Sequence, residues 1–363
     1  RFMNSTRHWL DGLKLRASYG VIGNQNINPY TFTPSMSVNN KATSWIIDDT
    51  YVTSISSLPA LVSQNFTWEK VGTINVGLDV NLFNNRLSGV FEWYQRNTNG
   101  MLAPGVQLPA VVGASAPYQN TADMRTRGWE LSLNWRDQIG KVGYRIGFNL
   151  SDYKSEIIKY DDNAATKLLS SYYPGQTLGE IWGYVVDGYY TVDDFVDTSS
   201  WQLKEGVTSI NGYNVRPGDV KFKNLRDDDT STNVITSGDN TFDNPGDRKV
   251  IGNTTPRYQY GINLGMNYAG FDLNVILQGT GKRDYWISNV LTFPMNGDNF
   301  VPLFEGLSDY WMPKDPDNGD WSAVNPNAKY PRIYGNRGNS GSNLRQSDKY
   351  LSDASYLRIK NIT

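Results

Sequence analysis

Eight segments of the chain, each about ten residues long, alternate apolar and polar residues. In residues 72–83, for example, Ile74, Val76, Leu78 and Val80 alternate with polar residues. Such alternation gives a β-strand one apolar face and one polar face. The eight segments are Leu13–Gly20, Gly72–Phe83, Arg86–Arg96, Arg127–Arg136, Val142–Asp152, Tyr258–Tyr268, 271–280 and Ala354–Thr363.

The connections between these segments alternate strictly between long and short. The short ones are residues 84–85, 137–141 and 269–270, and the long ones are residues 21–71, 97–126, 153–257 and 281–353. In an up-and-down antiparallel sheet, successive connections leave from opposite ends of the strands, so all the long ones gather at one end. Outer-membrane barrels have this asymmetry, with short periplasmic turns and long outer loops. The sequence therefore predicts an all-β fold: a transmembrane antiparallel β-barrel with long extracellular loops, of which this chain supplies about eight strands.

Aromatic residues stand near the ends of the apolar faces, including Tyr19, Trp93, Trp129 and Tyr144. Interfacial girdles of membrane barrels use these residue types. A β-sandwich core explains any one such strand, but eight strands with sorted connections favour a barrel whose polar faces line a wet lumen. The residues expected to face lipid are Ile74, Val76, Leu78, Val80, Leu131, Leu133, Ile146, Phe148, Ile262, Leu264, Leu273 and Val275.

Composition excludes several classes of function. The chain has no Cys, which excludes disulfides, thiolate metal sites and cysteine nucleophiles, and its single histidine is His8. A net charge of −2 without a basic run argues against nucleic acid as a partner. No apolar run approaches the ~18–20 residues of a membrane-spanning helix. Nucleophile-elbow, zincin, dinucleotide-binding and P-loop motifs do not occur, so we expect no catalytic residue, no cofactor and no enzymatic activity.

Five stretches carry a resemblance to a known family. The most specific is Asn65–Leu102, with its W-E-K, G-L-D and N-N-R-L-S-G segments; Asn120–Trp135, Arg216–Leu225, Asp247–Leu273 and Ala354–Thr363 follow in the same order. Together they resemble the SusC/RagA-type TonB-dependent outer-membrane transporters of Bacteroidetes. The resemblance implies a barrel of about 22 strands. It also implies that residues 1–363 are a C-terminal portion of that barrel, with the plug domain and the TonB-contacting segment outside this chain.

The resemblance further implies a function and partners. Such transporters, located in the cell outer membrane, take up oligosaccharides or peptides with a SusD-like surface lipoprotein that closes over the barrel. The TonB–ExbB–ExbD complex would act through the N-terminal part that these residues lack. The expected partners are therefore the lipoprotein, this complex, a glycan or peptide substrate and outer-membrane lipids.

The long connections contain many aromatic residues, and their length suggests that they carry structure and function of their own. Residues 153–257 form the longest connection, which we expect to make much of the substrate or lid surface. The aromatic side chains expected to contact substrate or lid are Trp182, Tyr189, Tyr190, Trp286 and Trp311. The alternative is that these residues form small cores inside the loops, because a binding site uses few of its lining residues.

Two other functions stay open at the level of sequence. A secreted or surface glycan-binding or glycan-cleaving β-protein could use a carboxylate pair such as Asp193 with Asp194, or Glu180 with Asp187. A surface adhesin would also associate with membranes. The acidic stretch Asp227–Asp229 lacks the alternate spacing and the glycine of a calcium loop, which favours a solvated loop over a metal site.

Overall fold

The computed structural model forms two compact units. The first, here called the strand wall, contains Arg1–Leu178, Arg257–Gly279 and Leu357–Thr363. The second, the loop unit, contains Gly179–Pro256 and Thr280–Tyr356. The structure describes residues 6, 8–25, 67–163, 165–169, 171–226, 233–287, 304–334 and 341–363, with short pieces between 33 and 63. The acidic stretch Asp227–Asp229 lies outside the described residues.

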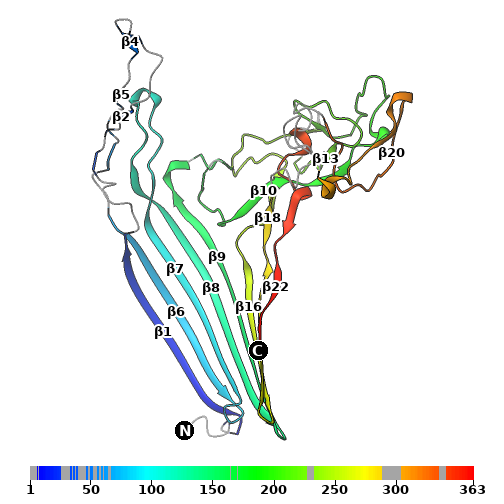
Figure 1. Ribbon diagram of the computed structural model, residues 1–363. Helices are drawn as coiled ribbons and strands as arrows, with labels where there is room; N and C mark the ends of the chain where they lie inside the picture. The colour runs from blue at the N-terminus through cyan, green and yellow to red at the C-terminus, as the bar shows by residue number, and fades with distance from the viewer. Residues whose placement is uncertain are drawn as a thin grey trace. The chain divides into compact units, whose positions relative to one another are not determined.

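The strand wall is built on one eight-stranded sheet with the order β1-β6-β7-β8-β9-β16-β17-β22 (Figure 1). Each of the eight predicted segments matches one of these strands, with at most two of its residues outside the strand at either end. The order of the eight strands in the sheet is also their order along the chain. The strands are β1 (Leu10–Asn24), β6 (Glu69–Leu82), β7 (Leu87–Pro104), β8 (Tyr118–Ile139), β9 (Val142–Tyr160), β16 (Arg257–Tyr268), β17 (Phe271–Lys282) and β22 (Tyr356–Ile362). The predicted all-β, up-and-down antiparallel fold is confirmed.

The short turns follow from residues that tolerate left-handed backbone. Ala269 and Gly270 have φ angles of 50° and 87°, so the expected two-residue hairpin between β16 and β17 is confirmed. The other two turns differ from expectation in length. Pairing of Ile139 with Val142 leaves a two-residue turn where 137–141 was expected, and pairing of Leu82 with Leu87 leaves a four-residue turn where 84–85 was expected.

Strands β7, β8 and β9 are longer than the alternating segments that identified them, with 18, 22 and 19 residues. A barrel strand needs only about 9–11 residues to cross the hydrocarbon core. Most of the extra residues lie at the ends of β7, β8 and β9 that join the long connections. Both faces of the strands are polar or mixed there. Alternation therefore stops before the strands do, which is why the sequence pattern underestimates their length.

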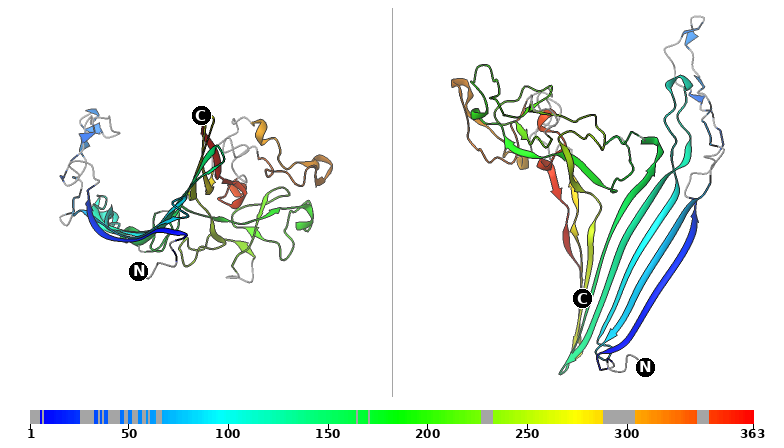
Figure 2. Two further views of the ribbon diagram at one scale, coloured as in Figure 1. Left: turned by 90° about the horizontal axis from the view of Figure 1, so that it is seen from below. Right: turned by 180° about the vertical axis from the view of Figure 1, so that it is seen from behind.

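Seen along the strands, the sheet of the strand wall is bent (Figure 2). Strand β1 stands at one edge of the sheet and β22 at the other, and each pairs on one side only in the described part of the chain. Bending with a continuous antiparallel ladder is the geometry of a barrel wall. The sheet is therefore a partial barrel.

Short strands and 3-10 turns make up the rest of the structure. In the first long connection these are β2 (Val38–Asn39), β3 (Ile46–Ile47), β4 (Thr50–Tyr51) and β5 (Ile55–Ser56). The loop unit contains β10 (Glu180–Tyr184), β11 (Val186–Tyr189), β12 (Ser209–Ile210), β13 (Val220–Phe222), β14 (Val234–Ile235), β15 (Arg248–Asn253), β18 (Asp284–Trp286), β19 (Pro313–Asp315), β20 (Asp320–Ala323) and β21 (Leu351–Asp353). The 3-10 turns are η2 (Ala110–Val112), η3 (Asp161–Asn163), η4 (Val192–Asp194), η5 (Glu305–Leu307), η6 (Pro316–Asn318) and η7 (Asp348–Tyr350). Among the described residues, no helix is long and apolar enough to cross a membrane.

Candidate functional site

One face of the strand wall is apolar across its width, and we call it the apolar face. Cross-strand registers align Leu15, Leu78, Phe91, Leu131, Leu150 and Tyr260 in one row from β1 to β16. A second row aligns Val80, Gly89, Leu133, Phe148 and Ile262. The expected lipid-facing residues of β6, β8, β9 and β16 therefore share one face. Several of them, including Ile74, Leu78, Ile146 and Leu264, are exposed although they are apolar.

Aromatic side chains border this face at both ends. Toward the long connections, Trp93 of β7 lies directly opposite Trp129 of β8. Toward the short turns, Trp135 Nε1 donates to the Tyr144 hydroxyl at 3.3 Å, and the Trp135 ring lies 6.3 Å from that of Phe83. The apolar rows lie between these two aromatic borders. An apolar band between aromatic girdles is the outer surface expected of a membrane barrel.

The opposite face, here called the polar face, carries charges that pair across strands. The Arg16 guanidinium contacts Asp79 at 2.8 Å and Glu92 at 2.6 Å, and so joins β1, β6 and β7. It can do so because Gly77 lies beneath it: a Cβ at that position would be 3.0 Å from an Arg16 nitrogen. A glycine thus makes room for a long side chain to cross the sheet.

Gly128 has the same role under Tyr94, its cross-strand neighbour on the polar face. A Cβ at Gly128 would lie 2.6 Å from the Tyr94 ring and 2.9 Å from the Tyr153 Cβ. In the full-length protein, Gly128→Ala is expected to destabilise the barrel by about 1–3 kcal/mol, because Tyr94 must leave its position. The measurement is the unfolding temperature of the heat-modifiable band on a gel. Gly20→Ala is the matched control, because nothing lies within 4 Å of a Cβ there, and an equal shift for both variants would contradict the packing argument.

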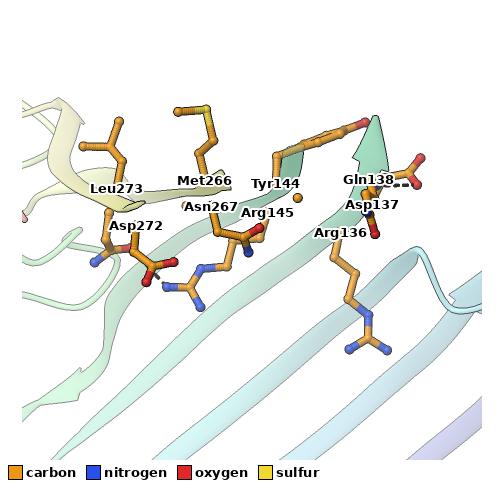
Figure 3. Close-up of a pocket in the computed structure, with 12 residues that line it drawn as sticks. Arg136, Asp137, Gln138, Tyr144, Arg145, Met266, Asn267, Asp272 and Leu273 are labelled. Carbon is orange, nitrogen blue, oxygen red and sulfur yellow. Dashed lines mark hydrogen bonds between the residues drawn. The ribbon is translucent and has the colours of Figure 1, made fainter. Parts of the chain in front are cut away.

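A shallow hollow of about 600 Å³ lies near the short turns between β8, β9, β16 and β17 (Figure 3). Met266 and Leu273 project to one side of the sheet there, and Arg136, Arg145 and Asp272 project to the other (Figure 3). Met266 lies on the apolar face, because it follows Leu264 by two residues along β16. Leu273 projects to the same side as Met266, so it also lies on the apolar face, as expected (Figure 3). Arg145 donates to the Asn274 side chain at 3.3 Å.

The aromatic residues expected to contact substrate or lid all lie in the loop unit. Tyr190, Trp311 and Trp182 are buried, and Tyr189 and Trp286 are half-buried. Tyr190 donates to the Thr208 carbonyl at 2.6 Å and Tyr189 donates to the Ala328 carbonyl at 3.0 Å. These contacts make the residues part of the interior of the loop unit, which is the alternative considered from the sequence. Their contact with substrate or lid stays a prediction.

Asp219, which sequence reasoning did not single out, is a buried side chain that links the two halves of the loop unit. Asp219 is fully buried and accepts from the Tyr334 hydroxyl at 2.7 Å, the Asn343 amide at 3.0 Å and the Arg216 backbone N–H at 2.8 Å. Burial raises the pKa of the Asp219 carboxyl, and hydrogen bonds from Tyr334 and Asn343 oppose that rise. The only sequence signal was its place in the stretch Arg216–Leu225.

The neighbouring residue Gly218 holds the same junction together by close packing. Its φ is 91°, and a Cβ there would lie 2.2 Å from the Trp311 ring. Its carbonyl accepts from the Arg332 backbone N–H at 2.8 Å. Only glycine fits both the left-handed backbone and the ring above it. Segments around residues 218 and 332, far apart in sequence, are thereby joined.

Three of the four carboxylates considered for a glycan-cleaving alternative have structural partners. Asp194 accepts from the Thr191 backbone N–H at 2.7 Å, which caps η4, and contacts Lys221 at 3.2 Å. Glu180 accepts from Trp182 Nε1 at 2.8 Å. Asp187 lies 3.9 Å from Lys223. Among the residues that the structure describes, no group of three or more His, Cys, Asp or Glu side chains could hold a metal ion.

The amino-acid sequence was compared with those of known proteins and protein families. No protein-family model matches the chain. TonB-dependent receptor P3 of Formosa agariphila is 28% identical over 365 residues, which cover 96% of this chain and 32% of that protein. TonB-dependent receptor SusC of Bacteroides thetaiotaomicron is 25% identical over 365 residues, which cover 98% of this chain and 31% of that protein. The chain thus spans about a third of the length of the relatives it matches.

Solved structures agree on the fold. The RagAB peptide importer in its closed-closed state matches with a TM-score of 0.67 at 23% identity, over 98% of this chain and 34% of the matched chain. Its open-open state matches with a TM-score of 0.68. The bordered apolar face and the polar face are those of a partial membrane barrel, and these likenesses relate that barrel to the TonB-dependent receptors. Within that class, the chain is similar over nearly its whole length to a receptor named SusC and to the RagAB importer, and the resemblance noted from its motifs is confirmed.

Proposed function

We propose that the protein containing this chain is an outer-membrane importer driven by the TonB–ExbB–ExbD complex. The observation that carries this proposal is the division of one sheet into an apolar face bordered by aromatic residues and a polar face with paired charges. In hydrocarbon, such a sheet exposes its apolar face to lipid and encloses the polar face as a lumen. The related receptors, and the importer whose fold it shares, support uptake as the function.

The substrate and partners follow as parts of the same proposal. The substrate is an oligosaccharide or a peptide, and the solved relative named as a peptide importer supports the peptide alternative. A SusD-like lipoprotein contacts the loop unit, within which Tyr189 and Trp286 keep part of their surface exposed. The plug domain and the TonB-contacting segment belong to parts of the protein outside residues 1–363, which form a C-terminal portion of the barrel.

The loop unit gives the decisive experiment. In the full-length receptor, replacing Gly179–Pro256 and residues 285–355 by short Gly/Ser linkers removes both halves of the unit together. The barrel should still assemble, because these excisions lie outside the ladder and shorter loops cost little entropy to close. Growth on the cognate nutrient and co-purification of the lipoprotein should be lost.

A matched control removes a different connection at the same end of the sheet. Replacing residues 105–117, between β7 and β8, by a short linker should leave uptake closer to that of the intact receptor. Growth and lipoprotein capture that persist without the loop unit, at matched receptor abundance in outer membranes, would refute its role in capture. Loss of heat-modifiable barrel instead would count against the division into wall and loops.

A further inference from the structure

Basic side chains gather on the apolar face just beyond its aromatic border on the side of the long connections. Arg127 precedes Trp129 along β8 by two residues, and so lies about 7 Å nearer to the long connections. Lys154 of β9 lies directly opposite Arg127, and Arg125 lies two residues further along β8. Register places all three on the same face as Trp129 and Leu131. We call these three residues the basic border.

The basic border holds positive charges in direct opposition. Residues directly opposite in an antiparallel pair have Cβ atoms about 5 Å apart, and like charges there destabilise the pair. Arg127 and Lys154 are both exposed. In the part of the chain that the structure describes, no ion pair joins any of the three basic residues to an acid. An anion from outside would relieve this repulsion.

Two acids lie near the basic border on the apolar face, but they do not neutralise the positive charges of Arg127 and Lys154. Asp152 of β9 is bound in an ion pair to Arg257. Glu156 lies opposite Arg125, one pair further along. Neither acid is opposite Arg127 or Lys154. The uncompensated charge is therefore at this pair.

Side-chain amides from β7 hold the two guanidinium groups in place. Arg127 Nε donates to the Gln95 Oε1 atom at 2.8 Å, and Arg125 Nε donates to the Asn97 Oδ1 atom at 3.3 Å. These bonds use the Nε atoms. Within the described part of the chain the terminal nitrogens of both guanidinium groups have no protein partner, so they can form the paired donors that suit a phosphate.

We propose that the basic border binds the phosphate of an anionic lipid in the outer leaflet. The proposal rests on the membrane placement given above, in which the aromatic border marks the level of the lipid headgroups. Cations just outside that level attract anionic headgroups. The site continues directly into Trp129, Leu131 and Leu150, so acyl chains of the same lipid can lie against the apolar rows. That continuity favours a lipid over a free anion.

The experiment compares two cation pairs on the same two strands. Full-length receptor, purified from outer membranes, is equilibrated in micelles with equal amounts of phosphatidic acid and phosphatidylcholine, and retained lipid is counted by native mass spectrometry. The variant R127Q/K154Q should retain about tenfold less phosphatidic acid than the wild type. The control R136Q/R145Q removes a directly opposed pair from the polar face and should retain as much as the wild type.

Each outcome decides the proposal. Equal retention in R127Q/K154Q and the wild type would overturn it, as would equal loss in the polar-face control. If millimolar inorganic phosphate displaced the lipid completely, the site would be one for free phosphate, and the lipid assignment would fall. The charge-preserving R127K/K154R should keep retention, and single variants R127Q and K154Q give the same comparison if the double variant does not assemble.

Failure of the lipid site is separable from failure of the membrane placement. The membrane placement is tested by introducing a charge at Leu78, which lies on the apolar face away from the basic border. A receptor that passes that test but shows no preference for phosphatidic acid would retain its proposed function and lose only this site.

Discussion

Replacing Leu78 by Arg in the full-length receptor is expected to destabilise the folded barrel by about 2–4 kcal/mol. Leu78 lies mid-strand on β6, with Leu15 and Phe91 directly opposite on its two neighbours. Its side chain is 37% exposed within an apolar row, so this surface would face hydrocarbon. A guanidinium there must be desolvated or must distort the bilayer, whereas leucine is stabilised by the same surroundings.

Asn75→Arg is the control, because Asn75 lies on the polar face of the same strand, opposite Ser18 and Tyr94. An arginine there would face a wet lumen already lined with charged side chains, so a much smaller loss is expected. The measurement is urea unfolding of the receptor in lipid bilayers, followed by the heat-modifiable band. Equal losses at both positions would mean that the two faces do not meet different solvents.

Alternation predicted the fold of the strand wall because both faces of each strand have uniform environments over about ten residues. The rows through Leu78 and Leu133 follow directly from that pattern. Strand ends were not predictable in the same way. Beyond Arg96 on β7 and before Arg127 on β8, polar residues are mixed with a small apolar cluster that includes Ala103 and Ala122. The ladder continues there by backbone hydrogen bonds, which leave no periodic signal.

The site was predicted less completely, for a different physical reason. Aromatic residues in long loops can pack inward or face a ligand, and the deciding neighbours are distant in sequence. Trp311 is buried because it covers Gly218, and no local pattern joins positions 93 residues apart. Asp219 escaped notice because a single acid in a turn resembles any solvated acid. The basic border escaped for the opposite reason: Arg127 and Lys154 are ordinary surface cations until register places them opposite each other.

Asp219→Ala is expected to open the loop unit while leaving the strand wall assembled. The change removes a buried acceptor from three donors, those of Tyr334, Asn343 and Arg216. Each unsatisfied buried donor costs about 1–3 kcal/mol, part of which is recovered by relaxation, so a loss of about 3 kcal/mol is expected. That loss raises the population of opened loop unit about a hundredfold. Limited proteolysis of the receptor in intact outer membranes measures this population when reclosing is fast.

Asp197→Ala is the matched control in the same unit, because Asp197 accepts its hydrogen bonds from Ser199 and Ser200 at an exposed site. It should change proteolysis little. Proteolysis that is unchanged in Asp219→Ala as well would show that Asp219 does not hold the two halves of the loop unit together. Heat-modifiable barrel should persist in both variants, since, among the described residues, the hydrogen bonds of Asp219 are all made within the loop unit.

The Asp219 carboxyl can gain a proton, whereas the amide in Asp219→Asn cannot. The stability of the loop unit should therefore depend on pH differently in the wild type and in this variant. Because burial raises the pKa of this carboxyl above its unfolded value, the folded loop unit binds the proton more tightly than the unfolded one. Stability from this group therefore increases as pH falls from neutral through the raised pKa toward about 3.9, and decreases as pH rises through the same window. The difference in proteolysis between wild type and Asp219→Asn isolates this contribution from that of the other acids. A difference that does not vary with pH across that window would mean that Asp219 titrates as an exposed aspartate does, and that the junction between the two halves of the loop unit is open to water.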